Sequence, residues 1–288
     1  MELFQYPYMQ RALIGALVIG LAAPALGIYL VQRKLALIGD GVGHVALTGV
    51  GAGLLLNRSP VLVAVVVATL GAIAIELVRA RGRTSGDLAL ALLFYGGIAG
   101  GVTLVGLSDA TSAKLTAYLF GSLVTISPGD LATIVVLGVV LLVTMLALRP
   151  ALFAVCHDEE YARVAGLPVQ ALNMLLAVAT AVTVTIAMQA VGVLLISALM
   201  VVPVATAQQV TRGFRSTMAA AMALGLFAAG SGVWVAANAD TAPGASVVLL
   251  AIASFLVVAV AGAGWRALRR HRAHTDHPAA EPHEVVLR

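Results

Sequence analysis

The chain has 288 residues, of which 61% are hydrophobic and 10% are charged, and its mean hydropathy is +1.02. Soluble domains contain about 25% charged residues, so this composition excludes a water-soluble globular protein. It indicates a polytopic membrane protein with nearly all of its mass in the bilayer. The net charge of +4 arises from basic residues in several separate loops, which argues against nucleic-acid binding. The single cysteine, Cys156, excludes an intrachain disulfide and a cysteine-based metal cluster.

Apolar segments long enough to cross a bilayer, about 20 residues each, predict an all-α transmembrane bundle of about nine spans. The count becomes eight if the long run 168–210 crosses once, and a break at Gln189 to Gly192 is the natural division. The apolar segment 113–125 is too short to cross and predicts a re-entrant or interfacial helix. The predicted spans are 12–32, 37–56, 60–79, 88–107, 129–148, 168–188, 191–210, 215–236 and 244–264.

The second predicted span contains the most informative pair of side chains. Asp40 and His44 are one helical turn apart, so both project from the same face. Ionisable groups at bilayer depth are costly and seldom present without a role. A carboxylate and an imidazole are also ligands for divalent transition metals. The alternative is that the pair hydrogen-bonds to itself or to a neighbouring helix and only fixes packing.

Glycine is abundant, with 29 residues in the chain. Several glycines recur at a spacing of four, which places them on one helical face and allows a neighbouring helix to approach closely. The sequence therefore predicts a tightly packed bundle. The pairs are Gly39 and Gly43, Gly49 and Gly53, and Gly97 and Gly101.

The chain lacks the signatures of an enzyme or of an energy-coupling site. Its two lysines, Lys34 and Lys114, are not part of a GxxxxGK[ST] phosphate-binding loop, so ATP, if it drives transport, binds to another subunit. Asp40 has no second intramembrane aspartate with which to form a protease dyad, and there is no HExxH motif. We expect Glu76 to pair with Arg79 at the helix end. We expect no catalytic residues and no bound cofactor.

The loop from His157 to Gly166 is polar and acidic. Asp158 is suited to cap a short helix, Glu159 and Glu160 to occupy its first turn, and Gly166 to end it. A short helix between two spans is what a permease needs in order to dock on a separate ATPase. The alternative is a solvated connector without a partner.

Five sequence blocks, in the same order, resemble the membrane permeases of ABC importers for zinc, manganese or related metals. They extend over residues 12–264, although each block alone is weak. The blocks are GDGVGH within 37–49, YLFGS within 115–122, the acidic loop 158–166, VGVLLISALMVVPVA at 191–205, and PGASVVL at 243–249.

The resemblance implies a transport subunit with several partners. Such permeases form a dimer, bind two copies of a cytoplasmic ATPase, and receive metal from an extracytoplasmic binding protein, with lipid around them. Asp40 and His44 match the family's paired Asp and His, which line the translocation path as transient metal ligands. Asp158, Glu159, Glu160 and Gly166 match the coupling helix. Zinc is favoured as the cargo, with manganese or iron as alternatives. Gln189 stands where other members carry Lys, which leaves the identity of the metal open.

Two other functions are compatible with part of the sequence. A secondary metal carrier would need no ATPase, and therefore no docking helix at 157–166. A purely structural membrane subunit would be insensitive to the loss of the Asp40 carboxylate.

The C-terminal residues 266–288 differ from the transmembrane domain at 1–265. They are polar, cannot build a core, and are predicted to be a disordered cytoplasmic tail. Four histidines in the tail could bind zinc weakly, although a solvated basic tail needs no such role. These histidines are His271, His274, His277 and His283.

The distribution of basic residues predicts the orientation in the plasma membrane. Fourteen of the 17 lysines and arginines fall on one side of the nine-span arrangement, and basic loops stay in the cytoplasm. The N-terminus is therefore predicted outside and the C-terminus in the cytoplasm.

Cysteine labelling tests this orientation. In a Cys156→Ser background, Glu2→Cys and Asn57→Cys should react with an impermeant thiol reagent in intact cells, whereas Asp276→Cys should react only after lysis. Labelling of position 276 in intact cells would show that the nine-span arrangement is wrong.

Overall fold

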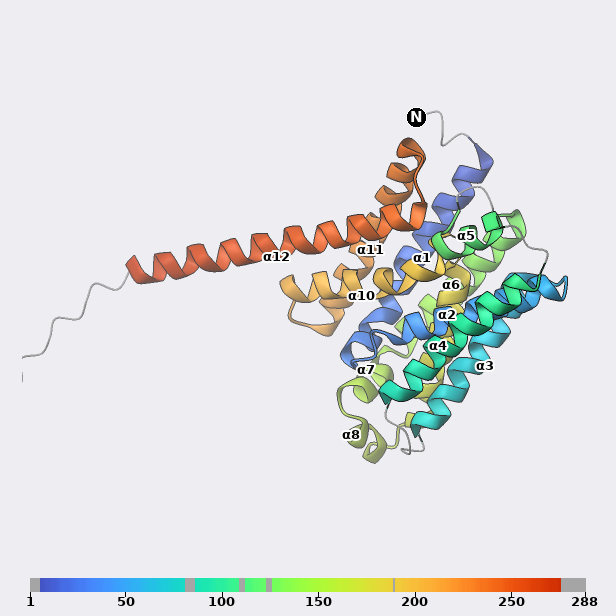
Figure 1. Cartoon of the computed structure of the whole chain (residues 1–288). Coiled ribbons are helices and arrows are strands. Elements are labelled where there is room, and N and C mark those ends of the chain that lie inside the picture. The colour runs from blue at the N-terminus through green and yellow to red at the C-terminus, as the bar shows by residue number, and fades with distance from the viewer. Residues whose placement is uncertain (1–5, 81–85, 109–111, 123–125, 189, 276–288) are drawn as a thin grey trace, which may run out of the picture.

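The computed structural model describes residues 6–80, 86–108, 112–122, 126–188 and 190–275, and its regular elements are all α-helices (Figure 1). This confirms the predicted all-α class within those residues. The helices are α1 (Pro7–Gln32), α2 (Ile38–Leu55), α3 (Pro60–Ala80), α4 (Gly86–Gly106), α5 (Ser112–Phe120), α6 (Pro128–Ala147), α7 (Arg149–His157), α8 (Glu159–Val164), α9 (Val169–Ala187), α10 (Val193–Val210), α11 (Phe214–Ala239) and α12 (Pro243–Thr275).

Seven of these helices are long and apolar enough to cross a membrane, namely α1, α2, α3, α6, α9, α11 and α12 as far as Gly264. The other two predicted spans correspond to α4 and α10, whose apolar stretches Leu90–Gly106 and Leu195–Val210 are shorter. Each predicted span therefore forms a helix, whereas nine complete crossings stay a prediction. The long run 168–210 does divide, since α9 ends at Ala187 and α10 begins at Val193; Gln189 lies outside the described residues.

The break between α9 and α10 packs against the end of the short helix α5. Gly192 has a φ of 92° and Gly121 a φ of 79°, a backbone conformation that other residues rarely adopt. A Cβ atom on Gly192 would collide with the backbone of Leu119 and Phe120. The predicted short helix in 113–125 is thus α5, although residues 123–125 lie outside the described residues and its place at the membrane interface stays a prediction.

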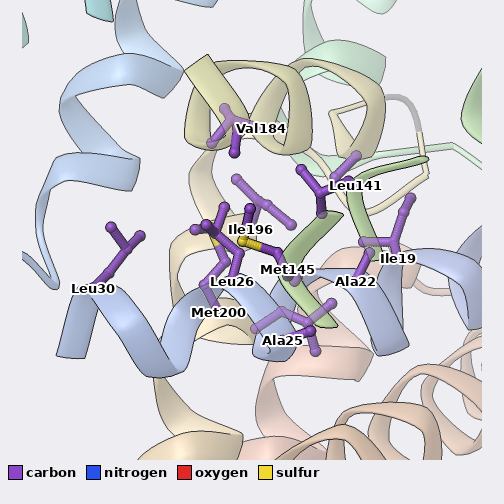
Figure 2. Close-up of a cluster of buried hydrophobic side chains, with 14 of the residues drawn as sticks. Ile19, Ala22, Ala25, Leu26, Leu30, Leu141, Met145, Val184, Ile196 and Met200 are labelled. Atoms are coloured by element: carbon purple, nitrogen blue, oxygen red, sulfur yellow. The ribbon is translucent and has the colours of Figure 1, made fainter. Parts of the chain in front are cut away.

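Helix α1 forms the centre of the apolar core, where side chains from α6, α9 and α10 converge on it (Figure 2). Polar side chains are also buried here, among them Tyr29, which is fully buried with its hydroxyl. This hydroxyl donates a hydrogen bond of 2.8 Å to the carbonyl oxygen of Met145, so burial leaves it satisfied. The labelled core residues are Ile19, Ala22, Ala25, Leu26 and Leu30 from α1, Leu141 and Met145 from α6, Val184 from α9, and Ile196 and Met200 from α10.

Helix α2 is held by glycine contacts with three neighbours. All three predicted pairs of small residues lie at such contacts, which confirms the tight packing expected from the sequence. The contacts are Gly39 and Gly43 with Ser197 and Val193 of α10, Gly49 and Gly53 with Ala64 and Pro60 of α3, and Gly97 and Gly101 of α4 with His44 and Leu47 of α2.

Helix α12 begins in the bundle and then extends away from it (Figure 1). Val247 and Ala251 are buried, whereas Val257 and Val260 are 67% and 71% exposed. The helix continues to Thr275, so 266–275, expected at the start of a disordered tail, is helical. Alanine, leucine and arginine dominate this stretch and favour helix. His271 and His274 belong to this helix, while His277 and His283 lie outside the described residues.

Two adjacent glycines on α4 test whether contact with α2 holds the fold. A Cβ on Gly97 would lie 2.6 Å from the backbone of His44 and Val45, whereas a Cβ on Gly96 would have no neighbour within 4 Å. Gly97→Ala should therefore destabilise the protein by about 1–3 kcal/mol and lower its thermal unfolding midpoint in detergent. Gly96→Ala should leave the midpoint unchanged or raise it slightly. Equal midpoints for the two variants would contradict this packing.

Candidate functional site

The structure places Asp40 in the first turn of α2 and His44 one turn further along the helix. The positive end of the helix dipole therefore lies beside the Asp40 carboxylate. Asp40 is half-buried and His44 is buried, with 8% of the residue exposed. The two side chains thus combine a carboxylate near the helix end with a more deeply placed imidazole.

The imidazole of His44 packs against an aromatic ring of α4. The ring centroids of His44 and Phe94 are 4.3 Å apart, with an interplanar angle of 79°. This edge-to-face contact restricts how the imidazole can turn. The Nδ1 atom of His44 is buried and has no hydrogen-bond partner among the described residues. A buried unpaired polar atom costs about 1–3 kcal/mol, and a ring nitrogen that carries a lone pair could be satisfied by coordination of a cation.

The carboxylate of Asp40 lines a cavity of about 290 Å³ between α2 and α4. Phe94 lines the same cavity and contacts His44, so one side chain of α4 borders both candidate ligands. Sequence reasoning missed this role of Phe94 and of its neighbour Tyr95, because an aromatic residue in an apolar span carries no signal until the partner helix is known. The other cavity residues are Leu37, Leu90 and Ala91.

Within the described residues, no three His, Cys, Asp or Glu side chains come together at a distance suited to one metal ion. A structural zinc site usually has four protein ligands. One copy of the chain can therefore offer Asp40 and His44 as a sparse, open pair. Such a pair suits brief contact with a passing cation better than permanent retention.

The acidic loop forms the short helix α8, as predicted. The Asp158 side chain accepts a hydrogen bond of 2.9 Å from the backbone N–H of Tyr161, and Glu159 and Glu160 occupy the first turn. Gly166 has a φ of 80° directly after the C-cap. Local sequence rules therefore set both ends of this helix correctly.

The carboxylate of Glu159 forms hydrogen bonds within the chain, whereas a residue that binds a partner protein would be expected to face outward. Its carboxylate accepts from Arg33 at 3.1 Å and from Asn173 at 3.3 Å. By contrast, Glu160 is exposed. Two further residues of α8, Tyr161 and Val164, are 68% and 88% exposed. The outer face of α8 thus combines an acidic side chain with apolar ones.

Helix α8 lies at the end of the bundle opposite the start of α1 (Figure 1). A second cavity, of about 440 Å³, lies beside it and is lined by Arg33, Glu76, Arg79, Glu159, Arg163 and Asn173 among others. The predicted pair of Glu76 and Arg79 is present, with a distance of 3.1 Å, and the Glu76 side chain is only 7% exposed. Charged side chains therefore gather at this end of the molecule.

Comparison with known proteins gives the same assignment along nearly the whole chain. The family model described as "ABC 3 transport family" matches residues 5–262. The manganese transport system membrane protein MntC of Halalkalibacterium halodurans is 32% identical over 255 residues, which cover 88% of this chain and 87% of that protein. The high-affinity zinc uptake system membrane protein ZnuB of Haemophilus influenzae is 31% identical over 246 residues, covering 85% and 94% respectively.

A solved structure extends the likeness to the fold. PsaBC from Streptococcus pneumoniae, in complex with Fab, aligns with a TM-score of 0.80 and 29% sequence identity, covering 88% of this chain and 92% of that chain. The sequence resemblance noted above is thereby confirmed. The chain belongs to the ABC 3 transport family, and its relatives in that family are multi-pass membrane permeases of metal ABC transporters.

Proposed function

We propose that the chain is the permease subunit of an ATP-driven importer of a divalent transition metal. The observation that carries this proposal is the buried imidazole of His44, whose Nδ1 has no hydrogen-bond partner in the described part of the chain, one turn from Asp40, which lines a cavity. Zinc is the favoured cargo because imidazole suits it well, with manganese or iron as alternatives. Relatives named for manganese and for zinc support this range of ions.

The pathway is proposed to lie between two copies of the chain. Each copy would present its own sparse pair to this pathway, because a closed shell of four protein ligands would hold the ion too tightly to pass it on. The rim of the Asp40 cavity supports this arrangement, because Leu37 and Tyr95 are 64% and 70% exposed there. A second copy packed on this rim would cover apolar surface and bring the two ligand pairs together.

The energy is proposed to come from a separate ATPase that docks on α8, with metal delivered by a binding protein at the opposite end. The exposed acidic and apolar residues of α8 support docking, as does its place at one end of the bundle (Figure 1). In this arrangement α8 and the C-terminus are cytoplasmic and the N-terminus is outside. A secondary carrier is the alternative, and it would leave the exposed face of α8 without a partner.

Removal of either candidate ligand should abolish most metal uptake. Asp40→Ala removes the charge that attracts a cation, and His44→Ala removes a nitrogen ligand. Loss of a group that merely supports a ligand costs 10–100-fold, so each variant should lose at least about tenfold. The assay is uptake of radioactive zinc or manganese by cells, at matched membrane abundance. Asp240→Asn is the control, because Asp240 is exposed in a left-handed turn that asparagine tolerates.

Uptake at the wild-type rate in both Asp40→Ala and His44→Ala would refute the pathway. An equal loss in Asp240→Asn would show that the assay reports general damage and not the removal of ligands.

Changes on the exposed face of α8 should weaken association with the ATPase. Reversal of the whole acidic run at 158–160 would also remove a cap and an internal ion pair. The sharper variant is Glu160→Lys combined with Val164→Asp, which alters exposed side chains alone. Copurification of the ATPase should fall by about tenfold or more, while thermal unfolding of the permease stays unchanged.

Arg58→Glu, in an exposed turn between α2 and α3, is the matched charge-reversal control. Undiminished copurification of the ATPase with the double variant would favour the secondary carrier.

A further inference from the structure

The guanidinium of Arg33, at the end of α1, forms a closed polar triangle with side chains of α8 and α9. It donates to Asn173 Oδ1 at 2.5 Å and to Glu159 Oε2 at 3.1 Å. Asn173 Nδ2 in turn donates to Glu159 Oε1 at 3.3 Å. Only 8% of the Arg33 side chain is exposed, so its charge depends on these partners because water cannot replace them.

A short, hydrogen-bonded turn joins Arg33 to the helix that carries the candidate ligands. Lys34 has a left-handed φ of 59°, its N–H donates to the carbonyl of Val31, and the N–H of Leu35 donates to the carbonyl of Leu30 at 2.8 Å. These two bonds close the end of α1 as a Schellman motif. Ile38 then begins α2, and Asp40 lies in its first turn. Because the turn is short and internally bonded, a displacement of the backbone at Arg33 can be passed on to the start of α2.

The surroundings of α8 differ on its two sides. Ala162 is fully buried and attaches the helix to the core. Toward α3, however, Glu159 and Arg163 line a cavity of about 440 Å³ that they share with Glu76 and Arg79. The polar triangle is therefore a defined connection between α8 and α1, beside a space that leaves α8 room to move relative to α3.

We propose that Arg33, Glu159 and Asn173 are positioning residues that make metal passage depend on ATP hydrolysis. A movement imposed on α8 by the ATPase is transmitted through Glu159 to Arg33, then through the turn at Lys34 to the start of α2 and to Asp40. This inference rests on the proposed function, because it needs an ATPase docked on α8. A role in stability alone would affect hydrolysis and uptake together.

The test measures metal uptake and ATP hydrolysis in vesicles that contain the full-length permease and its ATPase. Glu159→Gln keeps the shape of the side chain but removes its charge. The variant should keep ATPase copurification and hydrolysis near wild-type values, while zinc taken up per ATP falls by about tenfold, within the range of typical coupling between sites. Glu159→Asp keeps the charge on a shorter side chain, preserves the fold best, and should give an intermediate ratio.

Two further variants provide a control and a rescue. Arg163 also contacts the Glu159 carboxylate, at 3.6 Å, but its side chain is exposed and belongs to α8 itself. Arg163→Gln removes this cation, and the ratio of zinc taken up to ATP hydrolysed should not change. The exchange of charges in Arg33→Glu combined with Glu159→Arg should recover part of the ratio lost in Glu159→Gln.

The outcomes separate this inference from the proposed function. A wild-type ratio of zinc to ATP in both Glu159→Gln and Glu159→Asp overturns the inference, as does loss of ATPase copurification with unchanged thermal unfolding, which would make Glu159 a docking residue. Failure of any ATPase to copurify with the wild-type permease would instead contradict the proposed function.

Discussion

The close packing of α2 is the constraint on which the rest of the structure depends. Glycines at its contacts with α3, α4 and α10 allow backbones to approach to distances that any larger side chain would prevent. In lipid, where apolar surfaces gain little by leaving the solvent, such van der Waals contact is a main source of helix association. Gly97 meets the backbone at His44, and on the same helix pair the His44 imidazole packs against Phe94.

This packing links the fold to the proposed transport. His44 is buried, and its Nδ1 has no partner among the residues that the structure describes, while Asp40 stays half-buried at the wall of a cavity. A pair of this kind attracts a cation but cannot by itself enclose one. The turn that begins α2 is joined to Arg33 and through it to α8. The candidate ligands and the candidate docking helix are therefore connected through a few side chains and one stiff turn.

Features set by local geometry could be predicted from the sequence, whereas those set by distant partners could not. The cap at Asp158, the left-handed Gly166 and the pair of Glu76 with Arg79 depend on residues within one or two turns, and all three are present. Two partners of Glu159, Arg33 and Asn173, lie 126 and 14 residues away, and sequence spacing gives no sign of them. The polarity of residues 266–275 predicts disorder, whereas their helix propensity favours the helix that the structure has there.

The most direct test of the account is the coordination of zinc by Asp40 and His44 in the purified permease. Wild-type and His44→Ala proteins are incubated with the same zinc concentration, and X-ray absorption is recorded at the zinc edge. In the difference between spectra scaled to protein concentration, any contribution from the tail histidines cancels. The account predicts that the difference contains a nitrogen scatterer at about 2.0–2.1 Å, as expected for imidazole, and that the variant binds less zinc. Identical spectra and equal zinc content in the two proteins would contradict the assignment of His44 as a ligand.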